Sequence, residues 1–382
     1  MNKRERILNA INLKPVDRLP KTYRASDYIS NILIKYFKIN KENYNEIQIY
    51  KELIKKIGAD FYSSGSKLDK LSTYKPEYNG KKPSAPYIAD EQLFYTIGIN
   101  TILQKDEKHN VTHEIYIDPP WADYKSPKEI NQDKLISKLD LIDFGSMKES
   151  YFKKHKHGDG KAQNDEIICM GKTSSFFMIC IYLRGMENFL MDLAFNSKMA
   201  EYITKIVGEF CLEFNRRELN AFGKYADYYG TWDDVAGNQG LLLSPLLFKK
   251  YILPFYNKLI DNVKSLGILF GWHCCGSIHE VLPMMIDAGI DLFDVVQTSA
   301  RDMDIEKVYR FYGNRIAFHG GIDVQKLLID KKPKDIKAEI RKIIDLWGER
   351  GGMILAPSHE IQPGTPIENI LAIYGEINNY DK

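Results

Sequence analysis

A histidine and two cysteines directly follow an apolar run of strand length, in the segment GILFGWHCCGS at positions 267–277. Side chains of a strand alternate between its two faces, so His273 and Cys275 should point the same way and Cys274 the opposite way. Imidazole nitrogen and thiolate sulfur together suit zinc, which would need one or two further ligands from elsewhere in the chain. Cysteine is also among the most buried residue types, so these residues by themselves leave a packing role open.

Three other predicted strands also end in polar residues. The run YADYYG is followed by Thr231–Asp234, the run RIAF by His319–Gly321, and the run MILA by Pro357–His359. In a parallel barrel the reactive residues lie where strands end, because the loops after the strands form the active-site face. We therefore expect these four segments to meet on one rim.

Asp233 and Asp234 are candidates for substrate positioning or proton transfer, which makes them predicted catalytic residues. A loop carboxylate that caps a helix is an equally good interpretation of either residue. Trp232 is a candidate for lining the mouth of the site, although most aromatic side chains belong to the core.

His319 is a third predicted catalytic residue, and Gly320 and Gly321 after it are predicted to bind substrate. Two glycines after a strand allow a ligand to approach the backbone closely, and late loops of barrels often hold an anion. A tight turn that needs positive φ would explain the same two glycines.

Strand-like and helix-like runs alternate from about Asp165 to Ala356, and this alternation predicts a parallel sheet. Counting strands that the first part of the chain could supply, it favours a (β/α)₈ TIM barrel over an open sheet. We expect one barrel domain over residues 1–382, with an N-terminal helical extension over 1–58 and an insertion or lid over 68–160. The expected strands are Gly58–Tyr62, Glu166–Gly171, Tyr225–Gly230, Gly267–Trp272, Asp291–Val296, Arg315–His319 and Met353–Ala356, and the expected helices include Tyr28–Tyr36, Asn45–Ile57, Glu187–Phe222, Pro245–Ser265, Ile278–Ala288, Ile305–Tyr312 and Lys337–Trp347.

Composition narrows the class of protein. The 382 residues are 44% hydrophobic, and 53 basic against 51 acidic residues leave a formal net charge of +2, so no overall field favours nucleic acid or a membrane. Five cysteines, an odd number in a long chain, indicate a reducing compartment rather than a disulfide framework. The charged N-terminus has no apolar run of the length that secretion or a membrane span needs, so we expect a cytoplasmic protein.

Five segments resemble the uroporphyrinogen decarboxylase superfamily: RERILNAINLKPVDRLP, DDVAGNQGLLLSPLLFKKYILPFY, HCCGSIHEVLPMMIDAGIDLFDVVQTSARDMD, FHGGIDVQKLL and ILAPSHEIQPGTPIENILAIYGE. They are more similar to its corrinoid-dependent methyltransferase branch, which includes the methylcobamide:coenzyme M methyltransferases, than to true decarboxylases. The resemblance implies a (β/α)₈ barrel with an N-terminal helical extension. It also implies a zinc ion held by His-x-Cys, which His273 and Cys275 match, and by a later cysteine.

Two departures from that resemblance matter. The position of the later cysteine holds His359, and a His273, Cys275, His359 set would leave zinc with one positive charge. Asp233, Cys274 or water could complete the shell instead. Decarboxylases of the superfamily carry an N-terminal arginine- and glycine-containing loop for substrate carboxylates, whereas this chain offers only Lys21–Ser26, where Tyr23 and Arg24 are the predicted substrate-binding residues.

These observations predict a zinc-dependent methyltransferase that moves a methyl group between a corrinoid carrier protein and a small thiol, methoxy or alcohol compound. The corrinoid would reside on a separate partner protein, because no segment resembles a corrinoid-binding domain. The alternatives are a decarboxylase of the same superfamily and a barrel that binds a small ligand without turning it over. The sequence leaves the oligomeric state open.

Overall fold

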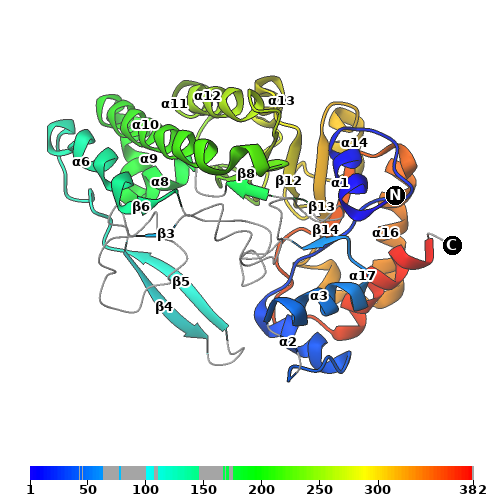
Figure 1. Cartoon of the computed structure of the whole chain (residues 1–382). Coiled ribbons are helices and arrows are strands. Elements are labelled where there is room, and N and C mark those ends of the chain that lie inside the picture. The colour runs from blue at the N-terminus through cyan, green and yellow to red at the C-terminus, as the bar shows by residue number, and fades with distance from the viewer. Residues whose placement is uncertain are drawn as a thin grey trace.

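Six parallel strands form the central sheet of the structure, a computed structural model. They are β7 (Cys169–Gly171), β8 (Tyr228–Trp232), β11 (Leu269–His273), β12 (Leu292–Val296), β13 (Ala317–Ile322) and β14 (Met353–Pro357). Their order in the sheet is β14-β13-β12-β11-β8-β7, so each strand of this sheet lies beside the next one that the chain adds to it. Strands β8, β12, β13 and β14 are labelled in Figure 1.

The N-terminal part of the chain extends this sheet. Strand β1 (Thr22–Tyr23) pairs in parallel with β2 (Phe61–Tyr62), and Lys21 bridges Leu355, which places β1 beside β14. The described strands thus follow the order of a (β/α)₈ barrel, and the predicted fold class is confirmed. The predicted extension over 1–58 therefore contains a strand of the sheet, which two residues are too short to reveal as an alternating pattern.

The structure describes residues 1–42, 44, 46–62, 77–78, 100–106, 111–145, 167, 169–171 and 175–380. The predicted insertion over 68–160 lies partly outside these ranges, and the prediction of one domain over 1–382 stays a prediction. Within the insertion, β4 (Asn100–Asp106) and β5 (Val111–Ile117) pair as an antiparallel hairpin that extends away from the sheet in Figure 1. Strand β3 (Glu77–Tyr78) pairs with β6 (Ile142–Asp143).

Helices lie between the strands and cover the outside of the sheet, with α10 to α13 on one side and α14, α16 and α17 beside the N-terminal helices on the other (Figure 1). Their bounds are α1 (Lys3–Ile11), α2 (Asp27–Tyr36), α3 (Glu46–Ile57), α6 (Gln132–Ser137), α8 (Phe176–Arg184), α9 (Met186–Phe195), α10 (Ser197–Phe222), α11 (Pro245–Tyr251), α12 (Leu253–Lys264), α13 (Leu282–Ala288), α14 (Ile305–Tyr312), α15 (Leu327–Asp330), α16 (Pro333–Trp347) and α17 (Ile367–Tyr380). Short 3₁₀ turns are η1 (Pro127–Glu129), η2 (Lys138–Leu141), η3 (Gly223–Tyr225) and η4 (Gly348–Arg350), and two short strands, β9 (Ala236–Gly237) and β10 (Gly240–Leu241), pair with each other. No helix of the described residues combines the length and the apolar character that crossing a bilayer requires.

In helix α10 the apolar residues of the periodic sequence pattern form the buried face of the helix. Ile203, Ile206, Val207 and Phe210 recur at helical spacing, and all are buried. The Asn196 side chain accepts a hydrogen bond from the Met199 N–H and separates α10 from α9. The helix predicted over Glu187–Phe222 is therefore two helices, because a capping residue starts a new helix inside one apolar pattern.

Helix α8 did not show in the sequence as an amphipathic pattern, because it is apolar on all sides. Nearly all of its residues are buried, which leaves no polar face to mark a helical period. Its own N-cap residue, Ser175, makes no capping hydrogen bond to the helix. The carboxylate of Asp233 takes that place, accepting hydrogen bonds from the N–H groups of Phe177 (2.9 Å) and Met178 (2.8 Å).

Asp233 is fully buried and also accepts a hydrogen bond of 3.0 Å from the Tyr256 hydroxyl. Burial raises the pKa of Asp233 to about 7, although the hydrogen bonds from Phe177, Met178 and Tyr256 oppose that rise. Its observed contacts attach the loop after β8 to α8. The predicted catalytic role of Asp233 stays a prediction.

We expect Asp233→Ala to lower the free energy of unfolding by about 2–4 kcal/mol, because it leaves two buried N–H groups and one buried hydroxyl without an acceptor. Urea denaturation followed by circular dichroism measures this loss. Asp287→Ala is the matched control, since Asp287 is 73% exposed and pairs with the exposed Arg315. Equal stability of the two variants would contradict the capping role.

Candidate metal centre

Four side chains of different strands meet at one level of the sheet. Trp232 of β8 pairs in register with His273 of β11, His273 with Asp294 of β12, and Asp294 with His319 of β13. Residues in register on neighbouring parallel strands point to the same face of the sheet. The predicted convergence of the strand ends after β8, β11 and β13 on one rim is therefore present in the structure.

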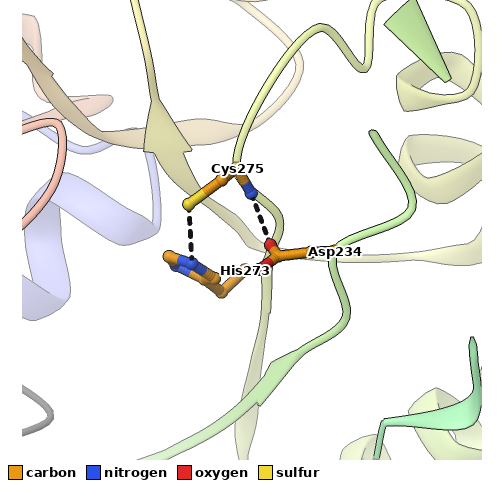
Figure 2. Close-up of side chains that lie close together, drawn as sticks. All are labelled: Asp234, His273 and Cys275. Carbon is orange, nitrogen blue, oxygen red and sulfur yellow. Dashed lines mark hydrogen bonds between the residues drawn. The ribbon is translucent and has the colours of Figure 1, made fainter. Parts of the chain in front are cut away.

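Asp234, His273 and Cys275 form a donor cluster at this rim. One carboxylate oxygen, one imidazole nitrogen and the thiol sulfur all lie within 4.8 Å of one another, and each residue is half-buried (Figure 2). The Cys275 Sγ and His273 Nε2 atoms are 3.4 Å apart. Donors bound to one tetrahedral zinc at roughly 2.0–2.3 Å lie about 3–4 Å from each other, so the cluster fits such an ion with modest adjustment.

The loop that carries Cys275 is held by hydrogen bonds to its backbone. The Cys275 N–H donates to Asp234 Oδ1 (2.8 Å), and the Gly276 N–H donates to Gln297 Oε1 (3.0 Å). Gly276 has a φ of +93°, and a Cβ at this position would lie 2.6 Å from the carbonyl oxygen of Gly237. The glycine therefore lets the loop pack against Gly237 and brings Cys275 back over His273.

Two neighbours, the carboxylate of Asp294 and the thiol of Cys275, determine the charge of His273. Burial opposes protonation, but the negative charges of Asp294 and then Cys275 outweigh burial and raise the pKa of His273 to about 10. The imidazole therefore holds a proton at neutral pH when its nitrogen has no metal partner. A metal ion has to displace that proton, so metal uptake should release protons and weaken as the pH falls.

His359 lies in the loop after β14 and is exposed, and it is not part of the donor cluster. Its pKa is lowered, first by partial desolvation and then by the positive charge of Arg24. The structure thus places Asp234 where His359 was predicted to complete the ligand set. The role of His359 as a ligand stays a prediction.

Cys274, the alternative ligand on the opposite face, is fully buried, and its thiol lies 3.3 Å from the Cys275 carbonyl oxygen. Burial raises the pKa of the Cys274 thiol well above its usual value. Its full burial is that of a packed thiol.

Arg24 follows β1 and points to the same rim. Its Nη1 lies 3.7 Å from Asp294 Oδ1, and its Nε and Nη1 atoms are buried without a hydrogen-bond partner in the described part of the chain. Tyr23, the adjacent residue, faces the other way: it is fully buried and its hydroxyl lies 2.9 Å from Ser30 Oγ. Of the two predicted substrate-binding residues in this loop, the structure brings Arg24 to the rim.

Gly320 and Gly321 lie inside β13, with φ values of +117° and +88°. A Cβ on Gly320 would lie 2.9 Å from the Val296 nitrogen, and one on Gly321 would lie 2.8 Å from Met353 Cε. Close packing of β13 against its neighbours accounts for both glycines. Their predicted contact with substrate stays a prediction.

Asp294 is the residue at the rim that our sequence analysis did not select. It lies in the strand LFDVV, and both of its carboxylate oxygens contact histidines, His273 and His319, at 2.6 Å. The sequence signal for a role of Asp294 was a single carboxylate within an otherwise apolar strand.

Residues 151–380 match the family described as Uroporphyrinogen decarboxylase (URO-D). The chain is 26% identical over 181 residues to the Methylcobamide:CoM methyltransferase MtbA of Methanosarcina acetivorans, a stretch that covers 47% of this chain and 50% of the relative. It is 26% identical over 147 residues to the Uroporphyrinogen decarboxylase of Coxiella burnetii, covering 37% of this chain and 38% of that protein. The chain thus spans about half or less of the length of the curated relatives it matches.

A solved methyltransferase from Methanosarcina mazei superposes over the whole of this chain and 99% of its own, with a TM-score of 0.65 and 17% sequence identity. At that identity the likeness concerns the fold. The family match covers more than half of the residues, in agreement with the strand order and with the resemblance inferred from the sequence. This chain belongs to the uroporphyrinogen decarboxylase (URO-D) family.

Proposed function

We propose that this protein is a zinc-dependent methyltransferase that moves a methyl group between a corrinoid carrier protein and a small thiol, methoxy or alcohol compound. The observation that carries the proposal is the donor cluster of Asp234, His273 and Cys275 at the rim where the strands end. Sulfur, nitrogen and carboxylate oxygen in one group suit zinc, and three protein ligands leave a position open for a substrate atom. The match to a methylcobamide:CoM methyltransferase supports methyl transfer as the reaction.

The ligand set determines what the site offers to a substrate. When bound, zinc would supply a Lewis acid that lowers the pKa of an acceptor thiol or polarises a methoxy or alcohol oxygen. Asp234 and Cys275 each contribute a negative charge, so the centre they form with His273 would carry no net charge, against the single positive charge expected with His359. A neutral centre leaves more electron density on a bound sulfur, which favours a thiol that attacks a methyl group.

The remaining rim residues would orient the substrate. The Arg24 Nε and Nη1 atoms are buried and have no hydrogen-bond partner among the described residues, and such a guanidinium favours an anionic group on the substrate. Trp232 lies beside His273 in register and offers an apolar wall. The methyl group itself would arrive on a corrinoid protein that docks over the rim, a transient contact because the carrier has to visit a second enzyme.

A decarboxylase is the second candidate, favoured by the relative from Coxiella burnetii. A porphyrinogen with many carboxylates needs several cationic partners, whereas Arg24 shares the described rim with Asp234 and Asp294. The thiol of Cys275 beside His273 has no evident use in decarboxylation. The geometry therefore supports methyl transfer better.

Metal analysis should find close to one zinc per wild-type chain and strong loss in His273→Ala, Cys275→Ala and Asp234→Ala, because each removes one donor of the cluster. His359→Ala should keep its zinc, since His359 lies outside the cluster. Inductively coupled plasma mass spectrometry of the purified variants measures this directly. Loss of zinc in His359→Ala with retention in Asp234→Ala would restore the ligand set predicted from the sequence.

We expect the zinc-loaded protein to accelerate demethylation of methylcobalamin, used in place of the carrier protein, by 2-mercaptoethanesulfonate. The absorption change on loss of the methyl group gives the rate, and zinc-free protein should show only the uncatalysed rate. The same preparation should leave uroporphyrinogen unchanged. Decarboxylation of uroporphyrinogen without any methyl transfer would overturn the proposal in favour of the second candidate.

The Arg24→Gln variant should raise KM for 2-mercaptoethanesulfonate by about 10- to 100-fold, the effect of losing one charged hydrogen bond of roughly 1.5–3 kcal/mol. KM for the neutral thiol 2-mercaptoethanol should change less than threefold, which makes it the internal control. Steady-state kinetics with methylcobalamin measure both values. Equal changes for the two thiols would exclude recognition of an anionic group by Arg24.

A further inference from the structure

Asp294 uses both oxygens of one carboxylate on two different histidines. Its Oδ2 lies 2.6 Å from His273 Nδ1 and its Oδ1 lies 2.6 Å from His319 Nδ1. An ionised carboxylate can only accept hydrogen bonds, so each Nδ1 carries the hydrogen in this arrangement. Both distances are those of strong, charge-assisted hydrogen bonds.

The contact to His273 decides which ring nitrogen faces the donor cluster. With Nδ1 held by Asp294, Nε2 is the nitrogen that points to Cys275 Sγ, 3.4 Å away. The backbone strengthens the same link, because the Cys274 N–H donates to the Asp294 carbonyl oxygen at 2.7 Å. The side chain of Asp294 thus holds His273, and its main chain holds the next residue, Cys274.

The contact to His319 anchors Asp294 to the first strand. His319 is buried, and its Nε2 lies 3.0 Å from Thr22 Oγ1, a residue of β1. Both ring nitrogens of His319 therefore have protein partners, and the ring bridges the carboxylate to Thr22. Arg24, two residues further along, lies 3.7 Å from Asp294 Oδ1, beyond hydrogen-bond distance.

We propose that Asp294 is a positioning residue that presents His273 Nε2 to the metal, and that His319 and Thr22 hold Asp294 in place. Burial raises the pKa of Asp294, but His273 and His319 outweigh burial and keep the carboxyl ionised. Partners of this kind fix the tautomer and the ring orientation of a metal-binding histidine and strengthen its bond to the ion. The inference rests on the proposed function in one respect, that His273 is a metal ligand.

The Asp294→Asn variant tests this inference, because the amide keeps the size of the side chain but can accept a hydrogen bond from only one of the two Nδ1–H groups. We expect zinc affinity to fall about 10- to 100-fold, measured by competition with a chromophoric chelator in the absence of any methyl donor or thiol. Thr22→Val should weaken zinc binding by a smaller factor, since it acts through His319. Asp302→Asn, an exposed carboxylate in the loop after β12, is the matched control and should bind zinc as the wild type does.

Cobalt(II) substitution separates positioning from a general loss of structure. At saturating cobalt, a misoriented His273 should shift the ligand-field absorption bands of Asp294→Asn relative to the wild type. A merely destabilised protein would bind less cobalt but show an unchanged spectrum. Thermal unfolding of the metal-free variants gives the accompanying change in stability.

Wild-type zinc affinity and an unchanged cobalt spectrum in Asp294→Asn would overturn the inference while leaving the proposed function intact. A wild-type protein that binds metal but transfers no methyl group would overturn the proposed function and leave the inference standing. A wild-type protein that binds neither zinc nor cobalt would overturn both.

Discussion

The parallel register of four strands is the constraint on which the candidate site depends. Trp232, His273, Asp294 and His319 lie in one row across β8, β11, β12 and β13, and each contributes a side chain to the same face. Because side chains alternate along a strand, a slip of one residue in any pair would turn that side chain toward the helices. The row exists only while the apolar faces of these strands stay packed against α10 to α16.

That packing has to offset the cost of buried polar groups at the rim. Asp294 lies between two imidazoles, and Asp233 is buried next to α8 with its hydrogen bonds satisfied by N–H and O–H donors. A buried carboxylate without such partners would be strongly destabilising. The outer face of the same strands compensates with aromatic packing, as where Trp272 contacts Tyr256 and Phe293. Polar function on one face and apolar packing on the other thus come from the same alternation.

The family includes enzymes that move methyl groups and enzymes that remove carboxylates, so the fold does not identify the reaction. The proposed reaction is instead argued from a few rim residues. A thiol beside an imidazole and a carboxylate is the basis of the proposed zinc site, whereas a porphyrinogen would require several cationic side chains. In the described rim, Arg24 lies 3.7 Å from Asp294 and is the cationic side chain that the single anionic group of the proposed substrate would contact.

Local periodicity let the sequence by itself determine the strand and helix alternation and the parallel sheet, since these follow from a period of two or 3.6 residues. Even there, α8 was missed because a helix buried on all sides has no polar face, and β1 because it is two residues long. The approach of Cys275 to His273 depends on the loop after β11, because that strand ends at His273. The third member of the donor cluster, Asp234, could not be identified from the sequence, because its place depends on distances between loops of different strands. Only the tertiary structure placed Asp234 of one loop against the backbone of another and left His359 exposed. The bridge from His273 through Asp294 and His319 to Thr22 likewise joins residues up to 297 positions apart in sequence, a separation that no local pattern encodes and that the register of the sheet decides.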